Sequence, residues 1–356
     1  MKSKYTFIYN AQIEALLDSF ITTVSKKISE SSVAKYLEFV VLGGGYGRGE
    51  GGILQTENSY KLYNDLDFFV LARNNVSKAQ LNEINTFFDN LSKLLEPLVE
   101  IDVDFSKAVK VSYAQKRLNV MAWLEMALGA NVIFGDNQKF KEIFTVNKDN
   151  KILRSEIVKL TMNRFSGLVF AYERLLSKQD LSIADKDFIA RNINKAILST
   201  GDIYLACKDN LPFKTADRLN IIENMSNIEH TNWQEFVCLY KSAVEFKMSP
   251  KIDFTKQEFE KRIRLSQRIL DKAFRYFKFF HSNCEHSILR RIKDFIILLK
   301  LSKLFETIPL DYEFYKKSVN PREKLIFLAS AFFEKNSELK TPKNFSTYKK
   351  IWERLA

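Results

Sequence analysis

Glycine gathers in one short stretch of this chain. Of the 11 glycines in 356 residues, seven lie between Gly43 and Gly52, within "VVLGGGYGRGEGG". Glycine loses more conformational freedom on folding than any other residue, so a cluster this dense predicts a specific local need. That need is either a turn with positive φ or a backbone that must approach a ligand closely. The apolar run "YLEFVVL" leads into the cluster, so a strand is expected to deliver the chain into this loop.

Paired carboxylates follow the glycine loop on a second predicted strand. Asp65 and Asp67 are two residues apart in the otherwise apolar run "LYNDLDFFVL". Residues two apart on a strand point to the same face, with Cα atoms roughly 7 Å apart. Burying two carboxylates side by side raises their pKa values unless a cation intervenes. The pattern therefore indicates an acidic site and not a casual solvated face.

A third predicted strand carries more acids. The stretch "LVEIDVDF", residues 98–105, alternates apolar and acidic residues, which is typical of a half-exposed strand. This alternation places Glu100, Asp102 and Asp104 on one face. If this strand pairs beside the strand of Asp65 and Asp67, three or more carboxylates converge.

The chemistry of such a cluster favours a hard metal ion. No histidine or cysteine precedes Cys207, and an all-oxygen set of ligands suits Mg²⁺ or Mn²⁺. Two such ions about 3.5–4 Å apart can clamp the attacking and leaving oxygens of a phosphoryl or nucleotidyl transfer. The backbone N–H groups of the glycine loop can hold phosphates. Arg48, in the same loop, can add charge-assisted hydrogen bonds to a triphosphate.

The order of the patterns predicts an α+β domain followed by an all-helical one. Helical periodicity alternates with strand patterns as far as residue 144, and the polar stretch "TVNKDNK", residues 145–151, marks the expected boundary. From residue 151 to 356 glycine almost vanishes and long helical patterns follow one another. We therefore expect a domain over 1–144 with a mixed sheet and flanking helices, and an all-α domain over 151–356. Within the first domain the expected helices span 10–28, 77–96 and 113–128. Ser77 and Gln80 form a capping-box pattern that opens the second of them, and Pro97 is expected to end it.

The net charge of +12 is unevenly distributed. Residues 1–150 hold 17 basic and 18 acidic side chains, so the remaining 38 basic and 25 acidic ones give residues 151–356 a net charge of +13. A basic domain can attract nucleic acid, a nucleotide or an acidic protein. The alternative is that these lysines lie on the solvated surfaces of helices and bind no partner.

Membrane and secreted classes are disfavoured by the sequence. There is no apolar run long enough to cross a bilayer, and "MKSKYTFIYNAQ" lacks the apolar core of a signal peptide. The three cysteines are odd in number and widely spaced, which argues against a disulfide framework. We expect a cytoplasmic protein with no membrane partner.

Two other phosphate-binding motifs fit the loop less well. A Walker A loop ends in Lys followed by Ser or Thr, and that ending is missing here. A dinucleotide-binding Rossmann fold needs an acid about twenty residues after the loop. Asp65 lies at that distance, but a Rossmann site leaves Asp67 and the second acidic strand without a role.

Taken together, these motifs resemble the nucleotidyltransferase (DNA polymerase β-like) superfamily. Its pattern is a strand ending in Gly-Gly, then Asp-x-Asp, then a strand with an acid between apolar residues. The loop "GGYGRGE" is similar to that of the uridylyltransferases that modify the PII nitrogen-signalling protein, and "NDLDFFVL" resembles their Ser-Asp-x-Asp strand. "LGANVIFG" is similar to the segment that often closes the minimal domain. The resemblance covers residues 36–136.

The resemblance implies a nucleotide-binding loop. It places Gly44 and Gly45 at the phosphates of an NTP. Tyr46, Arg48 and Glu50 lie in the same motif and are expected to contribute to nucleotide binding.

The resemblance also implies a set of metal ligands. Asp65 and Asp67 would hold Mg²⁺ or Mn²⁺. A third acid, which in the family binds metal and assists deprotonation of the acceptor, falls on Asp104 or Asp102. We favour Asp104 because it is nearer the end of its strand. Glu125, on the helical stretch "MAWLEMALG", is expected to face solvent, with an auxiliary role at the site as the alternative.

The sequence departs from the family pattern in two ways. The interval before Asp65 holds an extra stretch, "GGILQTENSYKLY", which is expected to form a hairpin or a lid. The PII-modifying enzymes also carry a His-Asp hydrolase domain, but no histidine of this chain is followed by Asp. The resemblance is therefore to the catalytic module alone.

The expected activity is Mg²⁺-dependent transfer of a nucleoside monophosphate from an NTP to an acceptor, with release of pyrophosphate. The acceptor can be a small molecule, a protein or an RNA end, the last suggested by the basic helical domain. The alternative is a catalytically silent module that binds a nucleotide or RNA as a regulator or as a toxin–antitoxin component.

Overall fold

The computed structural model of the chain divides into two compact units. The first unit comprises Met1–Leu153 together with two short later segments, Pro212–Asp217 and Glu245–Pro250; the second comprises Arg154–Leu211, Arg218–Val244 and Lys251–Ala356. The structure describes residues 3–56, 59–147, 151–225, 232–280, 288–306, 320–334 and 340–356.

The first unit is built on a mixed sheet. Its strands are β1 (Leu37–Leu42), β4 (Asp65–Ala72), β5 (Asp102–Phe105), β6 (Val109–Lys110) and β7 (Asn131–Phe134). They run in the order β5-β4-β1-β7, with β6 also paired to β4. Strand β1 is antiparallel to β4 and β7, whereas β4 is parallel to β5 and β6. The predicted α+β class, with a mixed sheet and flanking helices, is confirmed.

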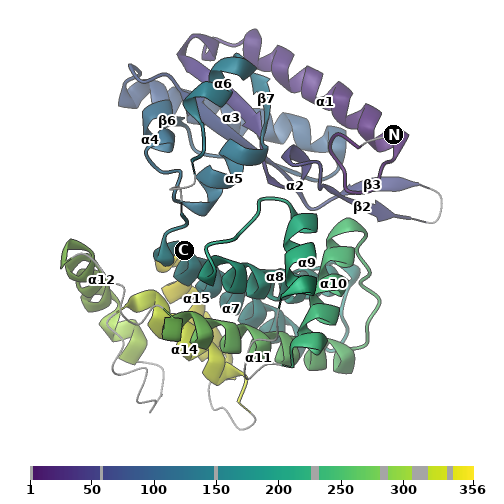
Figure 1. The fold of residues 1–356 in the computed structure, drawn as a ribbon, viewed down its shortest axis with the longest axis vertical. Helices are drawn as coiled ribbons and strands as arrows, with labels where there is room; N and C mark the ends of the chain where they lie inside the picture. The colour runs from purple at the N-terminus through teal and green to yellow at the C-terminus, as the bar shows by residue number, and fades with distance from the viewer. Residues whose placement is uncertain are drawn as a thin grey trace. The chain divides into compact units, whose positions relative to one another are not determined.

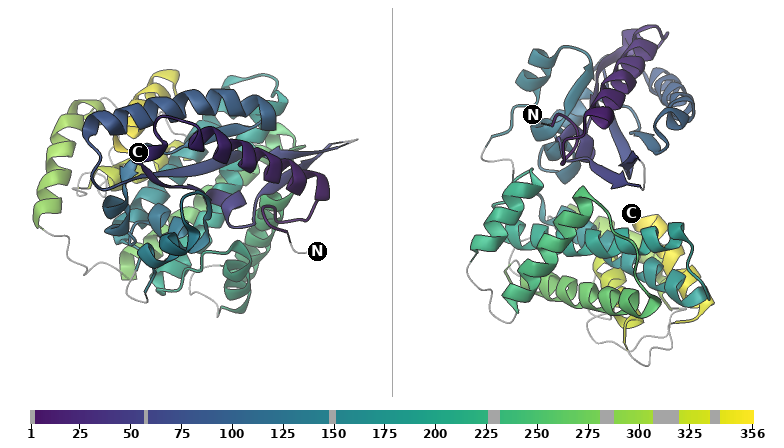
Figure 2. Two further views of the ribbon diagram at one scale, coloured as in Figure 1. Left: turned by 90° about the horizontal axis from the view of Figure 1, so that it is seen from above. Right: turned by 90° about the vertical axis from the view of Figure 1, so that its right-hand side faces the viewer.

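Two long helices cover one face of the sheet, as Figures 1 and 2 show. They are α1 (Ala11–Ser29), capped by Asn10, and α3 (Lys78–Val99), which opens with the predicted capping box of Ser77 and Gln80. Their apolar stripes pack with alternate strand side chains into one buried cluster that includes Leu17, Phe88 and Phe68. This face of the sheet is closed by hydrophobic burial.

Three short helices cover part of the other face. They are α4 (Val111–Gln115), α5 (Met121–Gly129) and α6 (Asn137–Ile143). Their core cluster contains Phe39 and Leu71 from the sheet and Met126 and Phe140 from the helices. Because strand side chains alternate between faces, this is the face to which Asp65 also belongs.

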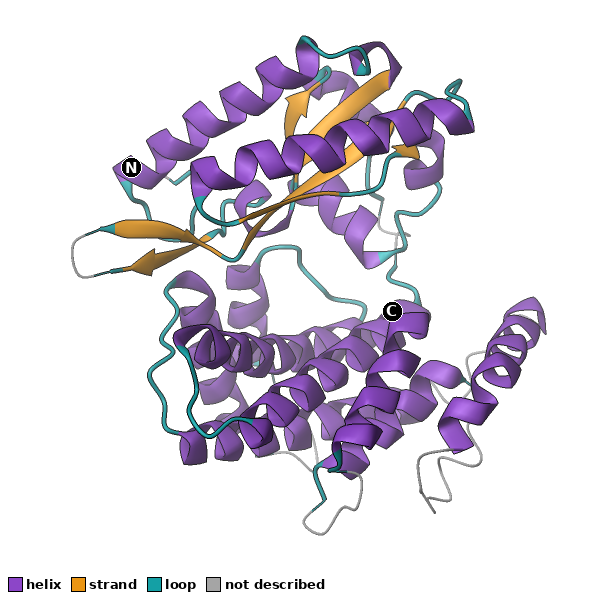
Figure 3. Cartoon of the chain, turned by 180° about the vertical axis from the view of Figure 1, so that it is seen from behind, coloured by secondary structure: helices purple, strands orange, loops and turns teal. Residues whose placement is uncertain are grey.

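The stretch between the glycine loop and Asp65 forms a hairpin. Strands β2 (Gly52–Gln55) and β3 (Tyr60–Tyr63) pair antiparallel in a separate two-stranded sheet (Figure 3). Of the two expectations for this stretch, the hairpin is correct; residues 57 and 58 of its connection lie outside the described residues.

Several predicted boundaries were wrong. Helix α3 continues through Pro97 to Val99, because the burial of Leu95 and Val99 offsets the hydrogen bond that proline removes from the last turn. Glu100 then ends the helix in the left-handed conformation (φ 57°), so it is not part of the strand with Asp102. The predicted helix over 113–128 is two helices, α4 and α5, separated at residues 116–120.

The second unit is helical, and its described residues contain no strand. Its helices are α7 (Arg154–Ser177), α8 (Ile183–Cys207), α9 (Thr215–Asn224), α10 (Trp233–Met248), α11 (Lys256–Phe280), α12 (Ile288–Glu306), α14 (Pro321–Phe332) and α15 (Pro342–Leu355). Helices α7, α8 and α11 pack against one another, and α14 packs against α7. The first turn of α9 and the last turn of α10 belong by their contacts to the first unit. No helix in the described part of the chain combines the length and apolar character needed to span a membrane.

Candidate metal and nucleotide site

The glycine loop starts directly beside β4. Strand β1 ends at Leu42, and the Gly43 amide donates to the Asp67 carbonyl at 2.8 Å. The short helix α2 (Gly44–Gly47) follows at once. The ladder between the two strands therefore brings the first turn of the loop next to the paired acids.

Gly44 explains part of the glycine cluster. Its φ is +59°, a conformation that L side chains rarely adopt, and a Cβ built on it would lie 2.2 Å from Oδ2 of Asp67. A side chain at this position would therefore be strained and would also strike the carboxylate. Both expected reasons for a glycine, a positive φ and a close approach, apply to this one residue.

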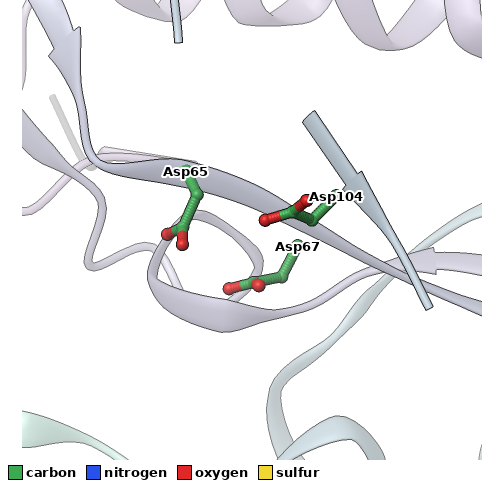
Figure 4. A group of neighbouring side chains, drawn as sticks. All are labelled: Asp65, Asp67 and Asp104. Atoms are coloured by element: carbon green, nitrogen blue, oxygen red, sulfur yellow. The ribbon is translucent and has the colours of Figure 1, made fainter. Parts of the chain in front are cut away.

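Three carboxylates gather on the face of β4 next to this turn. Asp65 and Asp67 alternate with buried Leu66, and the parallel pairing of β4 with β5 sets Asp67 opposite Asp104. One carboxylate oxygen of each acid lies within 4.8 Å of those of the other two. Figure 4 shows the three side chains directed into the same space beside β4.

Asp102 is aligned with Asp65 in the same register, but it is not part of the three-carboxylate group. Partial burial, followed by the charges of Asp65, Asp102 and Glu96, raises the pKa of Asp104. The structure thus places the Asp104 carboxylate with those of Asp65 and Asp67 and leaves Asp102 as a neighbouring charge. The pairing of β4 with β5 alone would allow either acid of β5 to join the group.

The donor set fits a hard divalent cation. All three groups are carboxylates at the edge of an apolar core. Burial and, after it, charge repulsion raise the pKa of Asp104, and a cation among the acids would relieve the repulsion. Oxygen ligands of this kind suit Mg²⁺ or Mn²⁺ better than softer metals.

Tyr46 anchors the loop through its side chain. The ring is 2% exposed, and its hydroxyl donates to the Gly52 carbonyl at 2.7 Å and accepts from the Tyr63 amide at 2.9 Å. Burial raises the pKa of Tyr46. The Tyr46 side chain therefore fastens the loop to the β2–β3 hairpin, and its part in nucleotide binding stays a prediction.

Glu50 is also buried and bonded to other parts of the first unit. It is 5% exposed and accepts hydrogen bonds from the Thr215 amide (2.6 Å), the Thr215 hydroxyl (2.8 Å) and Lys247 Nζ (3.0 Å). Burial alone would raise the pKa of Glu50, but the charge of Lys247, the Thr215 hydroxyl and Arg48 together lower it. A buried carboxylate with these partners would repel a triphosphate, so the contacts favour a structural role for Glu50, and its part in nucleotide binding stays a prediction.

Arg48 lies between two carboxylates. Its Nε is 3.5 Å from Glu50 and its Nη1 is 3.2 Å from Glu125. A triphosphate would have to compete with both acids for this guanidinium. Glu125, expected to face solvent, has a side chain only 28% exposed.

Thr215 and Lys247 were not predicted from the sequence. Both lie far along the chain, in the two later segments that belong to the first unit. Neither belongs to a motif, and a lysine on a helical pattern predicts a solvated face. Glu50 is the only signal in the loop: if this acid is buried, it needs a cation partner, but the sequence does not show which distant lysine supplies it.

Replacing Glu50 by glutamine is expected to lower the free energy of unfolding at pH 7 by about 2 kcal/mol, because a buried charged hydrogen-bond network loses its carboxylate. The folded-state pKa of Glu50 lies below the ordinary value of 4.5. Its contribution is therefore present above pH 4.5 and is lost as the pH falls through the folded-state pKa. Chemical denaturation of wild type and variant over this pH range measures both effects.

The matched control is Glu100→Gln. Glu100 pairs with Lys61 at 2.6 Å, but both side chains are more than half exposed, at 67% and 51%. Exposed pairs contribute little, so this variant should unfold as the wild type does. Equal effects of the two substitutions would contradict the structural role of Glu50.

No protein-family model matches this chain, and no curated protein matches it either. The features of the site that point to a function are its geometry, its donor chemistry and the resemblance of its motifs.

Proposed function

We propose that the first unit has the nucleotidyltransferase fold and catalyses metal-dependent transfer of a nucleoside monophosphate from an NTP to an acceptor. The observation that carries this proposal is the convergence of Asp65, Asp67 and Asp104 within 4.8 Å beside a turn whose Gly44 leaves no room for a side chain next to Asp67. Acids alone are common on surfaces. Acids against a glycine turn that follows a strand supply both a cation site and a phosphate site.

The roles of the residues follow from their positions. Mg²⁺ or Mn²⁺, when bound, would supply the positive charge that neutralises the triphosphate. Asp65 and Asp67 would hold the ion, and the backbone amides at Gly44 and Gly45 would contact the phosphates. Preorganised positioning and charge neutralisation carry most of the catalysis in such a site.

The proposed reaction is a displacement at the α-phosphorus. An oxygen or nitrogen of the acceptor forms a bond to the α-phosphorus as the bond to the bridging oxygen breaks, and pyrophosphate leaves. The acceptor proton passes to Asp104, which lies beside both other acids. The acceptor remains a small molecule, a protein or an RNA end in this proposal.

The direct test is label transfer. The protein is incubated with each common NTP carrying label on the α-phosphate, with Mg²⁺ or with a chelator, alone and with cell extract. Products are then separated into protein, RNA and small-molecule fractions. Metal-dependent label in one fraction, with pyrophosphate released in equal amount, supports the proposal and names the acceptor class. If no fraction takes label above the chelator background, the catalytic proposal is wrong.

A further inference from the structure

A basic groove lies at the far end of β4 from the acidic cluster. It is formed where α3 begins and where β6 leads into α4, and its volume is about 450 Å³. Leu81 and Val109 contribute apolar surface to it, whereas Lys110, Lys116 and Arg117 contribute positive charge. We call it the Tyr113 groove after the tyrosine that also lines it.

Within the described part of the chain, no acidic side chain balances the cations of the Tyr113 groove. None of the described residues that line the groove is acidic, and none of Lys110, Lys116 and Arg117 forms an ion pair with another described residue. Residues 1–150 carry a net charge of only −1, so the groove is a local concentration of positive charge in a nearly neutral region. Unpaired cations held together in this way attract a polyanion.

The groove also presents an aromatic surface. The Tyr113 side chain is 44% exposed, and the Arg117 guanidinium lies 3.5 Å from its ring centroid. Together they form a flat platform of the kind on which a nucleobase stacks.

An aromatic row connects this platform with the acidic cluster. The ring of Tyr113 is 6.4 Å from that of Trp123, which is 5.5 Å from that of Phe69. Phe69 follows Asp67 by two residues on β4 and therefore shares its face of the sheet. The row thus runs from the groove to the strand that carries the acids.

We propose that the Tyr113 groove binds single-stranded nucleic acid. The phosphates contact Lys110, Lys116 and Arg117, and a base stacks on Tyr113. An acidic peptide would satisfy the charges but would leave the aromatic platform unused. This binding needs no metal and no catalysis. A role for the bound strand as the acceptor rests on the proposed function, with the strand end lying toward the acids along the aromatic row.

The test measures binding of a short labelled single-stranded RNA, and of the same sequence as DNA, to the full chain in the presence of a metal chelator. Replacing Lys110, Lys116 and Arg117 together by alanine should weaken binding about a hundredfold at about 0.1 M KCl and reduce the salt slope by about 2, as three lost phosphate contacts predict. Tyr113→Leu should weaken binding about tenfold, and Tyr113→Phe should restore it. RNA bound more tightly than DNA would identify the biological strand.

The matched control replaces by alanine three exposed lysines of the same unit that do not line the groove: Lys26 and Lys27 on α1 and Lys93 in the later part of α3. This variant loses the same charge and should bind as the wild type does. Equal weakening of RNA binding by both triple variants would overturn the proposal. So would displacement of the labelled RNA by polyglutamate as readily as by unlabelled RNA, if Tyr113→Leu also had no effect. An Asp65→Asn, Asp67→Asn variant should still bind RNA in this assay, so failure of the catalytic proposal and failure of this one are separately visible.

Discussion

Replacing Asp65 and Asp67 together by asparagine is expected to lower label transfer by about a thousandfold or more, since cation neutralisation is worth several kcal/mol of barrier. Asparagine keeps the size of each side chain but removes the negative charge that holds a divalent ion. It also removes carboxylate repulsion, so the melting temperature without metal should not fall. Initial rates of transfer and thermal melts, with and without Mn²⁺, measure both expectations.

Asp104 and Asp102 are expected to differ in their contribution to transfer. Both are acids of β5 and face the same side, but only Asp104 joins the three-carboxylate group. Asp104→Asn should therefore reduce transfer as severely as the double variant, whereas Asp102→Asn should retain most of the wild-type rate. Mn²⁺ should raise the melting temperature of wild type and of Asp102→Asn, but not of the double variant. Full activity of the double variant would show that the assigned ligands are wrong, and equal loss at both β5 positions would show that the role assigned to Asp104 is wrong.

Gly44→Ala is expected to have the second largest effect. If the alanine keeps φ near +59°, its Cβ lies 2.2 Å from Oδ2 of Asp67. If it does not, the turn must move. The left-handed conformation costs about 1–2 kcal/mol, and displacement of the carboxylate should weaken metal binding as well. Calorimetric titration with Mn²⁺ and thermal melting distinguish the two consequences.

Gly49→Ala is the control for backbone strain. Gly49 also has a positive φ, +72°, but a Cβ there would approach the Lys4 carbonyl at 3.2 Å and not the acids. It should lower stability by a similar amount, about 1–2 kcal/mol, and leave Mn²⁺ affinity unchanged. If Gly49→Ala weakened metal binding as much as Gly44→Ala, the loss would reflect general strain and not contact with Asp67.

Some local elements could be predicted from the sequence because their causes are local. The periodicity of "NAQIEALLDSFITTVSKKI" and the Ser77 capping box predict helices that the structure contains as α1 and α3. The ends were less predictable, since Pro97 indicates a stop but buried Leu95 and Val99 carry α3 past it. Packing, which local pattern does not encode, decided that boundary.

The roles of loop side chains were the least predictable part of the site. The motif "GGYGRGE" suggests that Tyr46 and Glu50 serve a ligand, yet both are buried and bonded to the protein. Their partners include the hairpin and two segments far along the chain. A motif identifies which residues matter together, but not whether each one faces a ligand or the core.

Three features of this chain could be inferred from its sequence: a glycine turn after a strand, two acids on one face of the next strand, and a helical second part. These properties follow from conformational freedom and from the periods of strand and helix. The grouping of Asp104 with Asp65 and Asp67 is visible only in the folded chain, because it depends on how β4 and β5 pair and on which carboxylates that pairing brings together. The same is true of the neutralisation of Glu50 by Lys247, since a contact between residues so distant in sequence depends on the fold and not on local pattern.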